Sequence, residues 1–390
     1  MSMVERKIAV SMEESTAMKG NKYCVKMLWK DKELVLPNNR DVAKKRLLQL
    51  LKRLRAQPDI FKLYSENIKQ YVTKGYAKRM SYADARVSGD RSWYLPHHPV
   101  FNVNKPGKLR VVFDAASRYK GKSLNDVLHT GPDLVNKLIG VLLRFRNFPF
   151  TLVADIEGMF HQVKVSDQDR DSLRFLWVNS EDDSSIVTYQ MLVHIFGATD
   201  SPCCAAYALR RTAEDNKDEF SIETYNTVIK NFYVDDLLKS FKTEKDLLQI
   251  APELIQMLAK GGFHLAKFIS NSRSLLSSLP ESQLAHKLYD MDFSSELTDR
   301  ALGVKWHVER DEFLFTSLPD KQPVTKRGIL KTVSSIFDPL GFLTPFTVCA
   351  KIILQNTWRS RCGWDDLIDP CNHCIGYLAP TIKDHIIIQA

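Results

Sequence analysis

Two adjacent acids, Asp235 and Asp236, lie between two apolar runs and constrain the fold of this region more than any other feature. The runs cover residues 228–234 and 237–240, and both have the composition of β-strands. The pattern therefore predicts a hairpin with the carboxylates at its tip. Adjacent carboxylates repel each other, and a divalent cation would neutralise them. The alternative is an acidic turn that binds nothing, because Asp is a common turn residue.

A third acid, Asp155, ends the apolar run of residues 150–154, which has the pattern of a buried strand. If this strand neighbours the hairpin in one sheet, three carboxylates come together. Hard oxygen ligands suit Mg²⁺, and they suit Mn²⁺ as well. Two such ions about 3.5–4 Å apart clamp the attacking and leaving oxygens of a phosphoryl transfer. We therefore predict that Asp155, Asp235 and Asp236 bind two Mg²⁺ ions in a catalytic centre, with Mn²⁺ as the alternative metal.

The net charge of +9 is concentrated in one stretch of the chain. Residues 40–79 contain 12 Lys and Arg residues against three acids, and their apolar periodicity predicts two helices separated near Pro58. A basic helical hairpin favours a polyanionic partner such as a nucleic acid. The alternative is a solvated helix face without a ligand.

The rest of the chain mixes strand-like and helix-like patterns. Residues 91–114 predict strands around a turn at Pro106-Gly107, with Lys108 and Arg110 on one face as candidate phosphate contacts. Residues 1–36 lack strong periodicity and are expected to be a lead-in with some extended structure. Helices are predicted at about residues 133–147, 201–216, 244–260, 326–337 and 347–358, and strands at about 263–269 and 301–308. The mixture predicts an α+β fold.

No feature of the sequence indicates export or a membrane. The first residues carry no apolar core of a secretion signal, and no apolar run approaches the ~20 residues of a membrane span. The seven cysteines are scattered and do not form a disulfide framework. The Cys- and His-containing segment 362–374 has no second well-spaced pair, which favours free thiols over a zinc site. We expect an intracellular protein that is not secreted.

Several motifs occur in a fixed order along the chain. They are Leu36-Pro-Asn-Asn-Arg40, Trp93-Tyr-Leu-Pro-His-His-Pro-Val100, Arg110-Val-Val-Phe-Asp-Ala115, Ser123-Leu-Asn125, Gly131-Pro-Asp-Leu134, Asp155-Ile-Glu157, Met159-Phe-His-Gln162, Tyr233-Val-Asp-Asp236 and Phe337-Asp-Pro-Leu-Gly341. Together they resemble reverse transcriptases, and more narrowly the BEL/Pao lineage of long-terminal-repeat retrotransposons. The resemblance covers about residues 20–366.

The resemblance implies a right-hand polymerase fold with fingers, a palm whose antiparallel sheet is backed by helices, and a thumb. The implied parts are an N-terminal lead-in (1–36), fingers with the basic helical hairpin (37–149), a palm with the catalytic carboxylates (150–310), the start of a thumb or connection (311–366) and a diverged tail (367–390). The ribonuclease H and integrase regions of such an element are expected to be absent from this chain.

The implied activity is that of an RNA-directed DNA polymerase, a nucleotidyltransferase. Such an enzyme extends a primer 3′-hydroxyl with dNTPs on an RNA or DNA template. The expected compartment is the cytoplasm, with virus-like particles or the nucleus as alternatives, and no membrane partner is expected.

The resemblance also implies roles for single residues. Asp155, Asp235 and Asp236 would be the metal-binding catalytic triad. Phe160 would be the aromatic steric gate that favours deoxynucleotides, although a core phenylalanine is the structural alternative. Primer and template contacts would come from Tyr233, Arg46, Lys52 and Arg53.

The incoming nucleotide would be held by a further set of residues. Arg110 has the spacing of an arginine that contacts the triphosphate, and Lys108 is a weaker candidate for a second phosphate contact. Phe196 and Gly197 match the segment that lies against the incoming base and the template, where glycine would permit close backbone approach. Lys267 matches a lysine proposed as general acid for pyrophosphate, with an exposed strand lysine as the alternative.

Two departures from the lineage leave open whether this copy polymerises. Asp200 would place an extra negative charge near the template path, and Gly158 stands where Lys is common. The alternative function is therefore a catalytically silent remnant, or a domesticated protein that binds nucleic acid. A peptidase is a third possibility, but it would need a nucleophile and base that the sequence does not show.

Overall fold

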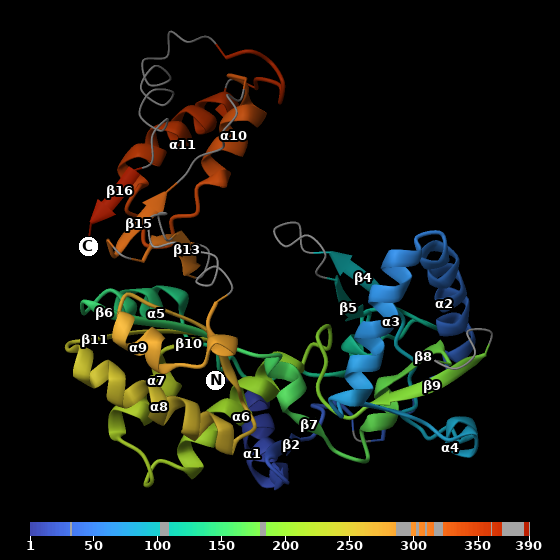
Figure 1. The fold of residues 1–390 in the computed structure, drawn as a ribbon. Coiled ribbons are helices and arrows are strands. Elements are labelled where there is room, and N and C mark those ends of the chain that lie inside the picture. Colours follow the sequence, from blue (N-terminus) through green and yellow to red (C-terminus); the bar gives the residue numbers. More distant parts are fainter. Residues whose placement is uncertain are drawn as a thin grey trace. The chain divides into compact units, whose positions relative to one another are not determined.

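The computed structural model describes residues 1–31, 33–101, 109–179, 185–285, 298–301, 304–308, 310–315, 323–359, 361–368 and 386–389. Helices and small sheets are mixed along the chain, as predicted (Figure 1). The chain divides into two compact units. The first unit comprises Met1–Val135, Ile156–Ile229 and Glu253–His264, and the second comprises Asn136–Asp155, Lys230–Pro252 and Leu265–Ala390.

The first unit contains small sheets with the strand orders β1-β2-β7, β3-β9-β8 and β4-β5. Their strands are β1 (Ala17–Lys19), β2 (Lys22–Val25), β3 (Ala77–Arg79), β4 (His97–Phe101), β5 (Leu109–Phe113), β7 (Lys164–Val165), β8 (Arg174–Val178) and β9 (Ile186–Met191). The helices are α1 (Met3–Ser15), α2 (Arg40–Arg55), α3 (Pro58–Thr73), α4 (Tyr82–Arg86), α6 (Ser201–Asp215) and α7 (Ile222–Lys230), with the short 3-10 helices η1 (Asn125–Val127), η2 (Met159–Gln162) and η3 (Arg170–Leu173).

The predicted basic helical hairpin is confirmed as α2 and α3. Apolar side chains of α2 recur at the helical period and are buried, namely Ala43, Leu47, Leu50, Leu51 and Leu54. Pro58 begins α3, where its missing N–H leaves no helical hydrogen bond unmade. Gly75 follows the end of α3 with a φ of 68°, a left-handed conformation that glycine adopts without a steric penalty.

Aromatic rings form the centre of the core in the first unit. Tyr64 of α3 packs against Trp177 of β8 with ring centroids 5.0 Å apart, and Phe113 of β5 packs against Phe175 of β8 at 5.2 Å. Large buried rings contribute much of the apolar area of a core. These contacts join α3 and β5 to β8, although the three elements are far apart in the sequence.

The second unit carries a sheet with the strand order β10-β11-β6-β12. Its strands are β10 (Phe232–Tyr233), β11 (Asp236–Phe241), β6 (Phe150–Ile156) and β12 (Leu265–Ser270). Helix α5 (Leu138–Phe145) lies against β11 (Figure 1), and its buried residues Val141, Leu142 and Phe145 share a hydrophobic cluster with Leu238. Helix α8 (Glu244–Lys260) follows β11 in the chain.

A further sheet of the second unit has the order β13-β14-β15-β16. Its strands are β13 (Thr298–Ala301), β14 (Val304–His307), β15 (Glu312–Phe315) and β16 (Ile386–Gln389). Trp306 packs edge-on against Phe145 at 5.2 Å and donates its Nε1–H to Asp311 at 2.8 Å, which joins β14 to α5. The remaining helices are α9 (Arg273–Ser278), η4 (Glu281–Gln283), α10 (Lys326–Ser335) and α11 (Thr344–Arg359). Helices α10 and α11 lie side by side (Figure 1).

Two details of secondary structure differ from the prediction. The lead-in begins with helix α1, which a capping box between Ser2 and Glu5 starts. Residues 228–230 belong to α7, so the first strand of the predicted hairpin is only Phe232–Tyr233. Asn39 precedes α2, and its side chain bonds the main chain of Tyr94 and makes no hydrogen bond to the helix end.

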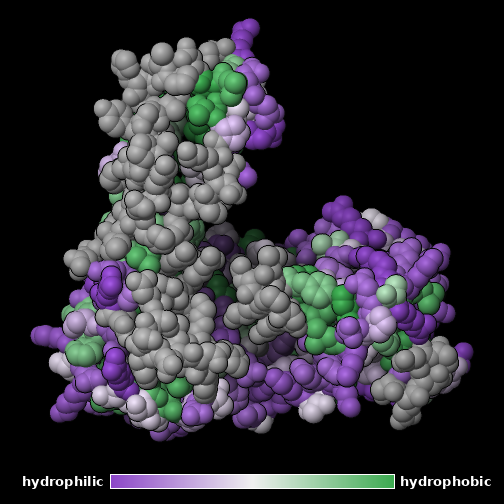
Figure 2. Space-filling model, turned by 45° about the horizontal axis from the view of Figure 1, so that its top comes forward, coloured by the Kyte–Doolittle hydropathy of each residue, from purple (hydrophilic) through white to green (hydrophobic). Residues whose placement is uncertain are grey.

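Hydrophilic side chains cover much of the coloured surface in Figure 2, with hydrophobic patches between them. No helix in the described ranges is long and apolar enough to cross a membrane. No disulfide joins the cysteines that the structure describes, namely Cys24, Cys203, Cys204, Cys349 and Cys362. Cys371, His373 and Cys374 lie outside the described residues.

Candidate active site

The predicted acidic hairpin is present in the second unit. Tyr233 pairs with Asp236 across β10 and β11, so Val234 and Asp235 form a two-residue turn. Val234 has a φ of 57°, and two-residue hairpin turns require a positive φ of this kind. A β-branched residue seldom adopts it, and such backbone strain is concentrated at functional sites. Asp235 therefore lies in the turn itself, and Asp236 is the first residue of β11.

The predicted neighbour of the hairpin is β6. Strand β11 pairs antiparallel with β6 in a register that places Asp236 directly opposite Asp155. Side chains directly opposite in an antiparallel pair point to the same face of the sheet, with Cβ atoms about 4.5–5.5 Å apart. The sheet therefore brings Asp155 and Asp236 together, with Asp235 next to Asp236 in the chain.

Lys267 of β12 completes this group of charges. Its Nζ lies 2.8 Å from Oδ2 of Asp155, on the strand that follows β6 in the sheet. Lys267 also has a positive φ, 58°, which is uncommon for a residue other than glycine. The side chains of Lys267 and Asp155 are 46% and 27% exposed, so water screens the pair. Sequence reasoning identified Lys267 but did not predict its contact with Asp155.

The electrostatics of the site differ from those of an ordinary acidic turn. Burial, together with the negative charges of Asp235 and Asp155, raises the pKa of Asp236 to about 7, and Lys267 opposes the shift. Without a cation, Asp236 is therefore partly protonated at neutral pH. A divalent cation would favour the ionised form, because opposite charge lowers the pKa of a carboxyl group.

The donor set fits a hard divalent cation such as Mg²⁺, since every candidate ligand is a carboxylate oxygen. The three carboxylates are not, however, already gathered around a single point. In the described part of the chain, the donor atoms of one group of three potential ligands all lie within 4.8 Å of one another, and that group is His194, Asp200 and Cys204. The hairpin carboxylates are thus positioned by paired strands and are wider apart than one closed metal site needs.

The first unit brings two of the predicted nucleotide-binding residues together. Phe160 lies in η2, directly after β6, and its ring is 4.4 Å from the ring of Phe196 between centroids. His161 packs beneath Phe196 at 5.5 Å, and burial lowers the pKa of His161 to about 4. Phe196 is 41% exposed and Phe160 is half-buried. The two rings form one partly exposed aromatic surface, which we call the Phe160–Phe196 pair.

Gly197 is required by the packing of the chain itself. It has a φ of 111°, and a Cβ there would lie 2.3 Å from the carbonyl oxygen of Phe113. The close approach is therefore to β5 of the same chain. Asn125 holds this turn from one side, because its Nδ2 donates to Gly197 O and its Oδ1 accepts from Thr199 N, each at 3.0 Å. The sequence carried no signal for this role of Asn125 beyond the motif around it.

The predicted basic contacts differ in their availability. Arg110 is exposed on β5 between the buried Leu109 and Val111, as the strand alternation predicted. Lys52 and Arg53 are exposed on α2. Lys108 lies outside the described residues.

Arg46 is engaged within the protein and is the weakest candidate for a primer or template contact. Its Nη1 lies 2.7 Å from Asp114 Oδ2 and 2.8 Å from Ser117 Oγ. An arginine already paired with a carboxylate has less of its charge available to a phosphate.

Two residues singled out in the sequence have structural roles. Asp200 was expected near the template path, but it is completely buried, with Oδ2 accepting from Leu28 N at 3.2 Å. Asp338, the acid of the Phe337-Asp-Pro-Leu-Gly341 motif, accepts hydrogen bonds from Phe342 N at 3.0 Å and Leu343 N at 2.7 Å, which caps a turn before α11. Neither carboxylate resembles a site poised for catalysis.

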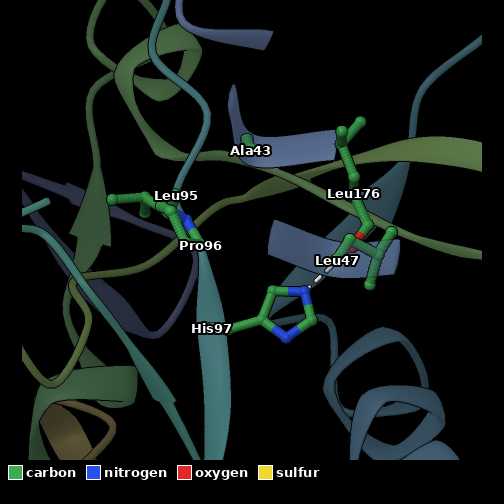
Figure 3. A pocket seen from close by; sticks show the side chains of 6 residues that line it. All are labelled: Ala43, Leu47, Leu95, Pro96, His97 and Leu176. Carbon is green, nitrogen blue, oxygen red and sulfur yellow. Dashed lines mark hydrogen bonds between the residues drawn. The ribbon is translucent and has the colours of Figure 1, made fainter. Parts of the chain in front are cut away.

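A small cavity in the first unit is lined by Ala43, Leu47, Leu95, Pro96, His97 and Leu176 (Figure 3). His97 Nε2 donates to Leu176 O at 2.9 Å, and Nδ1 accepts from the Tyr64 hydroxyl at 2.5 Å. Burial lowers the pKa of His97 to about 4, so the ring is neutral at physiological pH. With both nitrogens satisfied inside an apolar cavity, His97 is a core histidine and not a catalytic base.

Residues 325–374 match the family described as Pao retrotransposon-like RNaseH-like domain. The match supports a Pao retrotransposon origin for the chain. It covers α10, α11 and the start of the region predicted as a diverged tail, and it differs from the expectation that a ribonuclease H region is absent. No curated protein matches the chain.

Proposed function

We propose that the chain is the RNA-directed DNA polymerase domain of a Pao-like retroelement. The observation that carries the proposal is the register of β11 on β6, which sets Asp236 opposite Asp155, with Asp235 in the adjoining turn. A turn without a ligand would gain nothing from a third acid on the neighbouring strand, because each carboxylate raises the cost of ionising the others. The retroelement match at residues 325–374 supports the same origin.

In this proposal Asp155, Asp235 and Asp236 hold two Mg²⁺ ions, or Mn²⁺ in their place. Bound ions of this kind supply electrostatic stabilisation of the attacking and leaving oxygens in a phosphoryl transfer. Lys267 pairs with Asp155. With Asp155 engaged by a cation, the Lys267 ammonium group would be available to neutralise or protonate the departing pyrophosphate.

The first unit would hold the nucleotide and the nucleic acid. Arg110 presents an exposed guanidinium to the triphosphate. The Phe160–Phe196 pair would lie against the sugar and base, with Phe160 crowding a ribose 2′-hydroxyl. Lys52 and Arg53 would contact the phosphates of primer and template, and Tyr233 of β10 would lie near the primer terminus. Fingers, palm and thumb, at the boundaries given above, are the architecture that this function requires.

Primer extension tests the proposal directly. The unmutated chain should incorporate dTTP on a poly-rA/oligo-dT template when Mg²⁺ is present, and chelation of the metal should abolish incorporation. Asp235→Asn should lower the rate by at least about a hundredfold, as losses of transition-state charge stabilisation usually do. Asp246→Asn is the matched control, because Asp246 is an exposed acid of α8 in the same unit and should leave the rate unchanged.

The second candidate is a silent copy that binds nucleic acid without extending it. The exposed basic face of α2 supports this candidate, because such a face can bind nucleic acid without a catalytic centre. Binding of template–primer by the unmutated chain with no incorporation in Mg²⁺ or Mn²⁺ would establish this candidate and contradict the polymerase.

A further inference from the structure

Three side chains of the first unit converge in its interior, away from the acids of the hairpin in the sequence. His194 follows β9, Asp200 is the residue before α6, and Cys204 lies one helical turn further along. All three are at most 1% exposed, and their donor atoms lie within 4.8 Å of one another. Asp200 and Cys204 are four residues apart at the start of a helix, so they project from the same face.

The hydrogen bonds of this cluster leave lone pairs without donors. His194 Nε2 is 3.1 Å from Val25 O, and a carbonyl can only accept, so Nε2 carries the hydrogen and Nδ1 keeps a lone pair. Asp200 Oδ2 accepts from Leu28 N, whereas Oδ1 has no hydrogen-bond partner among the described residues although it is buried. A buried oxygen without a partner costs free energy and points to a missing cation or proton.

The neighbouring charged groups are already committed elsewhere. Asp169 accepts from Met27 N at 3.1 Å, from Trp29 Nε1 at 2.7 Å and from Ser166 Oγ at 2.7 Å, and Arg91 lies 3.6 Å from it. The positive charge of Arg91 therefore neutralises the negative charge of Asp169. Among the described residues, no Lys or Arg forms an ion pair with Asp200.

We propose that His194, Asp200 and Cys204 bind one Zn²⁺ ion in the interior of the first unit. Nitrogen, oxygen and sulfur are together the donor set that zinc accepts, whereas Mg²⁺ and Ca²⁺ require oxygen alone. One carboxylate and one thiolate also cancel the two positive charges of the ion. The occupied site is neutral, which is the condition under which a fully buried ion is tolerated. Three protein ligands leave one of the four usual positions for water.

The proton balance of binding is explicit. Burial raises the pKa of Asp200 and of the Cys204 thiol and lowers that of His194, so burial favours the uncharged form of each group. Zinc binds a carboxylate and a thiolate, so any proton held by either group goes to solvent when the oxygen–zinc and sulfur–zinc bonds form. Zinc affinity should therefore rise as pH rises.

The ion would restrain the loop that carries Phe196 and Gly197. His194 precedes this loop and Asp200 ends it, so a metal bound by both residues would hold the two ends of the loop together at the start of α6. The position of the exposed Phe196 ring would then be more rigid. This structural role does not depend on the proposed polymerase activity.

The test uses the full chain with Cys362→Ser, Cys371→Ser and Cys374→Ser, so that zinc cannot bind near the C-terminus. After chelation and dialysis, this chain should take up one Zn²⁺ per molecule, measured by mass spectrometry of the metal, and its Tm should rise with zinc. His194→Gln and Cys204→Ser should each abolish both effects. Cys203→Ser is the matched control, because Cys203 is a buried neighbour on the same helix.

Cobalt provides a readout that does not require the variants to fold. Co²⁺ added to the metal-free triple-serine chain should give a thiolate-to-cobalt charge-transfer band. The absence of that band, or zinc uptake that survives both His194→Gln and Cys204→Ser, would overturn the proposal. Stabilisation of the metal-free chain by Asp200→Asn together with no zinc uptake would show that a proton, and not a cation, satisfies Oδ1.

Discussion

Buried histidines illustrate how single residues of this protein depend on their surroundings. His97 and His161 are both enclosed by aromatic rings, and burial lowers the pKa of each to about 4 from an ordinary value of 6.5. His97 keeps both ring nitrogens bonded, so the neutral ring is part of the packing of α3, β4 and β8.

This burial predicts an acid-sensitive fold. Between pH 6.5 and about 4 the unfolded chain binds protons at these histidines and the folded chain does not, so stability falls as pH falls through that window. Each histidine should contribute on the order of 1–3 kcal/mol to the loss. Chemical denaturation at pH 7 and pH 4.5 measures it. His97→Gln should flatten the dependence, and His264→Gln, at an exposed position, should leave it intact. An unchanged slope in His97→Gln would contradict the assignment.

Among the secondary-structure elements, the turn at Gly197 shows how two distant segments fix a loop. Its φ of 111° and the 2.3 Å approach that a Cβ would make to Phe113 O leave no space for a side chain. The two hydrogen bonds of Asn125 hold the same turn. The position of the exposed Phe196 ring thus depends on β5 and η1, and neither element is near it in the sequence.

Gly197→Ala should therefore destabilise the fold by about 2–4 kcal/mol, from backbone strain plus overpacking against a carbonyl that cannot easily move. Gly75→Ala is the matched control, because Gly75 also has a positive φ, 68°, but has nothing within 4 Å of the added Cβ. It should cost only about 1 kcal/mol. If urea denaturation gives equal losses of unfolding free energy for the two variants, the contact with Phe113 is not the reason that position 197 requires glycine.

For the whole molecule, the excess of positive charge is the property that matters most. The net charge is +9, and the exposed face of α2 carries Lys52 and Arg53 over a buried apolar face. If this face contacts nucleic acid, it does so through phosphates, which makes binding sensitive to salt and insensitive to sequence.

Binding of an RNA–DNA template–primer should weaken steeply as salt rises. Lys52→Ala combined with Arg53→Ala should reduce the slope of log K against log salt by roughly 1–2, since each lost phosphate contact removes about 0.7–0.9. Arg6→Ala combined with Lys7→Ala removes the same charge from exposed positions of α1 and is the control. If both pairs reduce the slope equally, only net charge matters and α2 is not the contact surface.

The sequence by itself predicted the elements whose cause is local. The apolar periodicity of α2 and α8, the break at Pro58 and the acidic hairpin all follow from the types of neighbouring residues. Local patterns failed at residues 228–230, where a strand-like composition is helix α7, because short apolar runs fit either structure until packing selects one.

Only the tertiary structure decided which distant residues meet. The register of β11 on β6 sets Asp236 opposite Asp155, and β12 adds Lys267. Packing inside the first unit joins Phe160 to Phe196 and buries Asp200 with His194 and Cys204. The physical reason is that strand register and core packing depend on contacts between segments far apart in the chain, which no local pattern encodes.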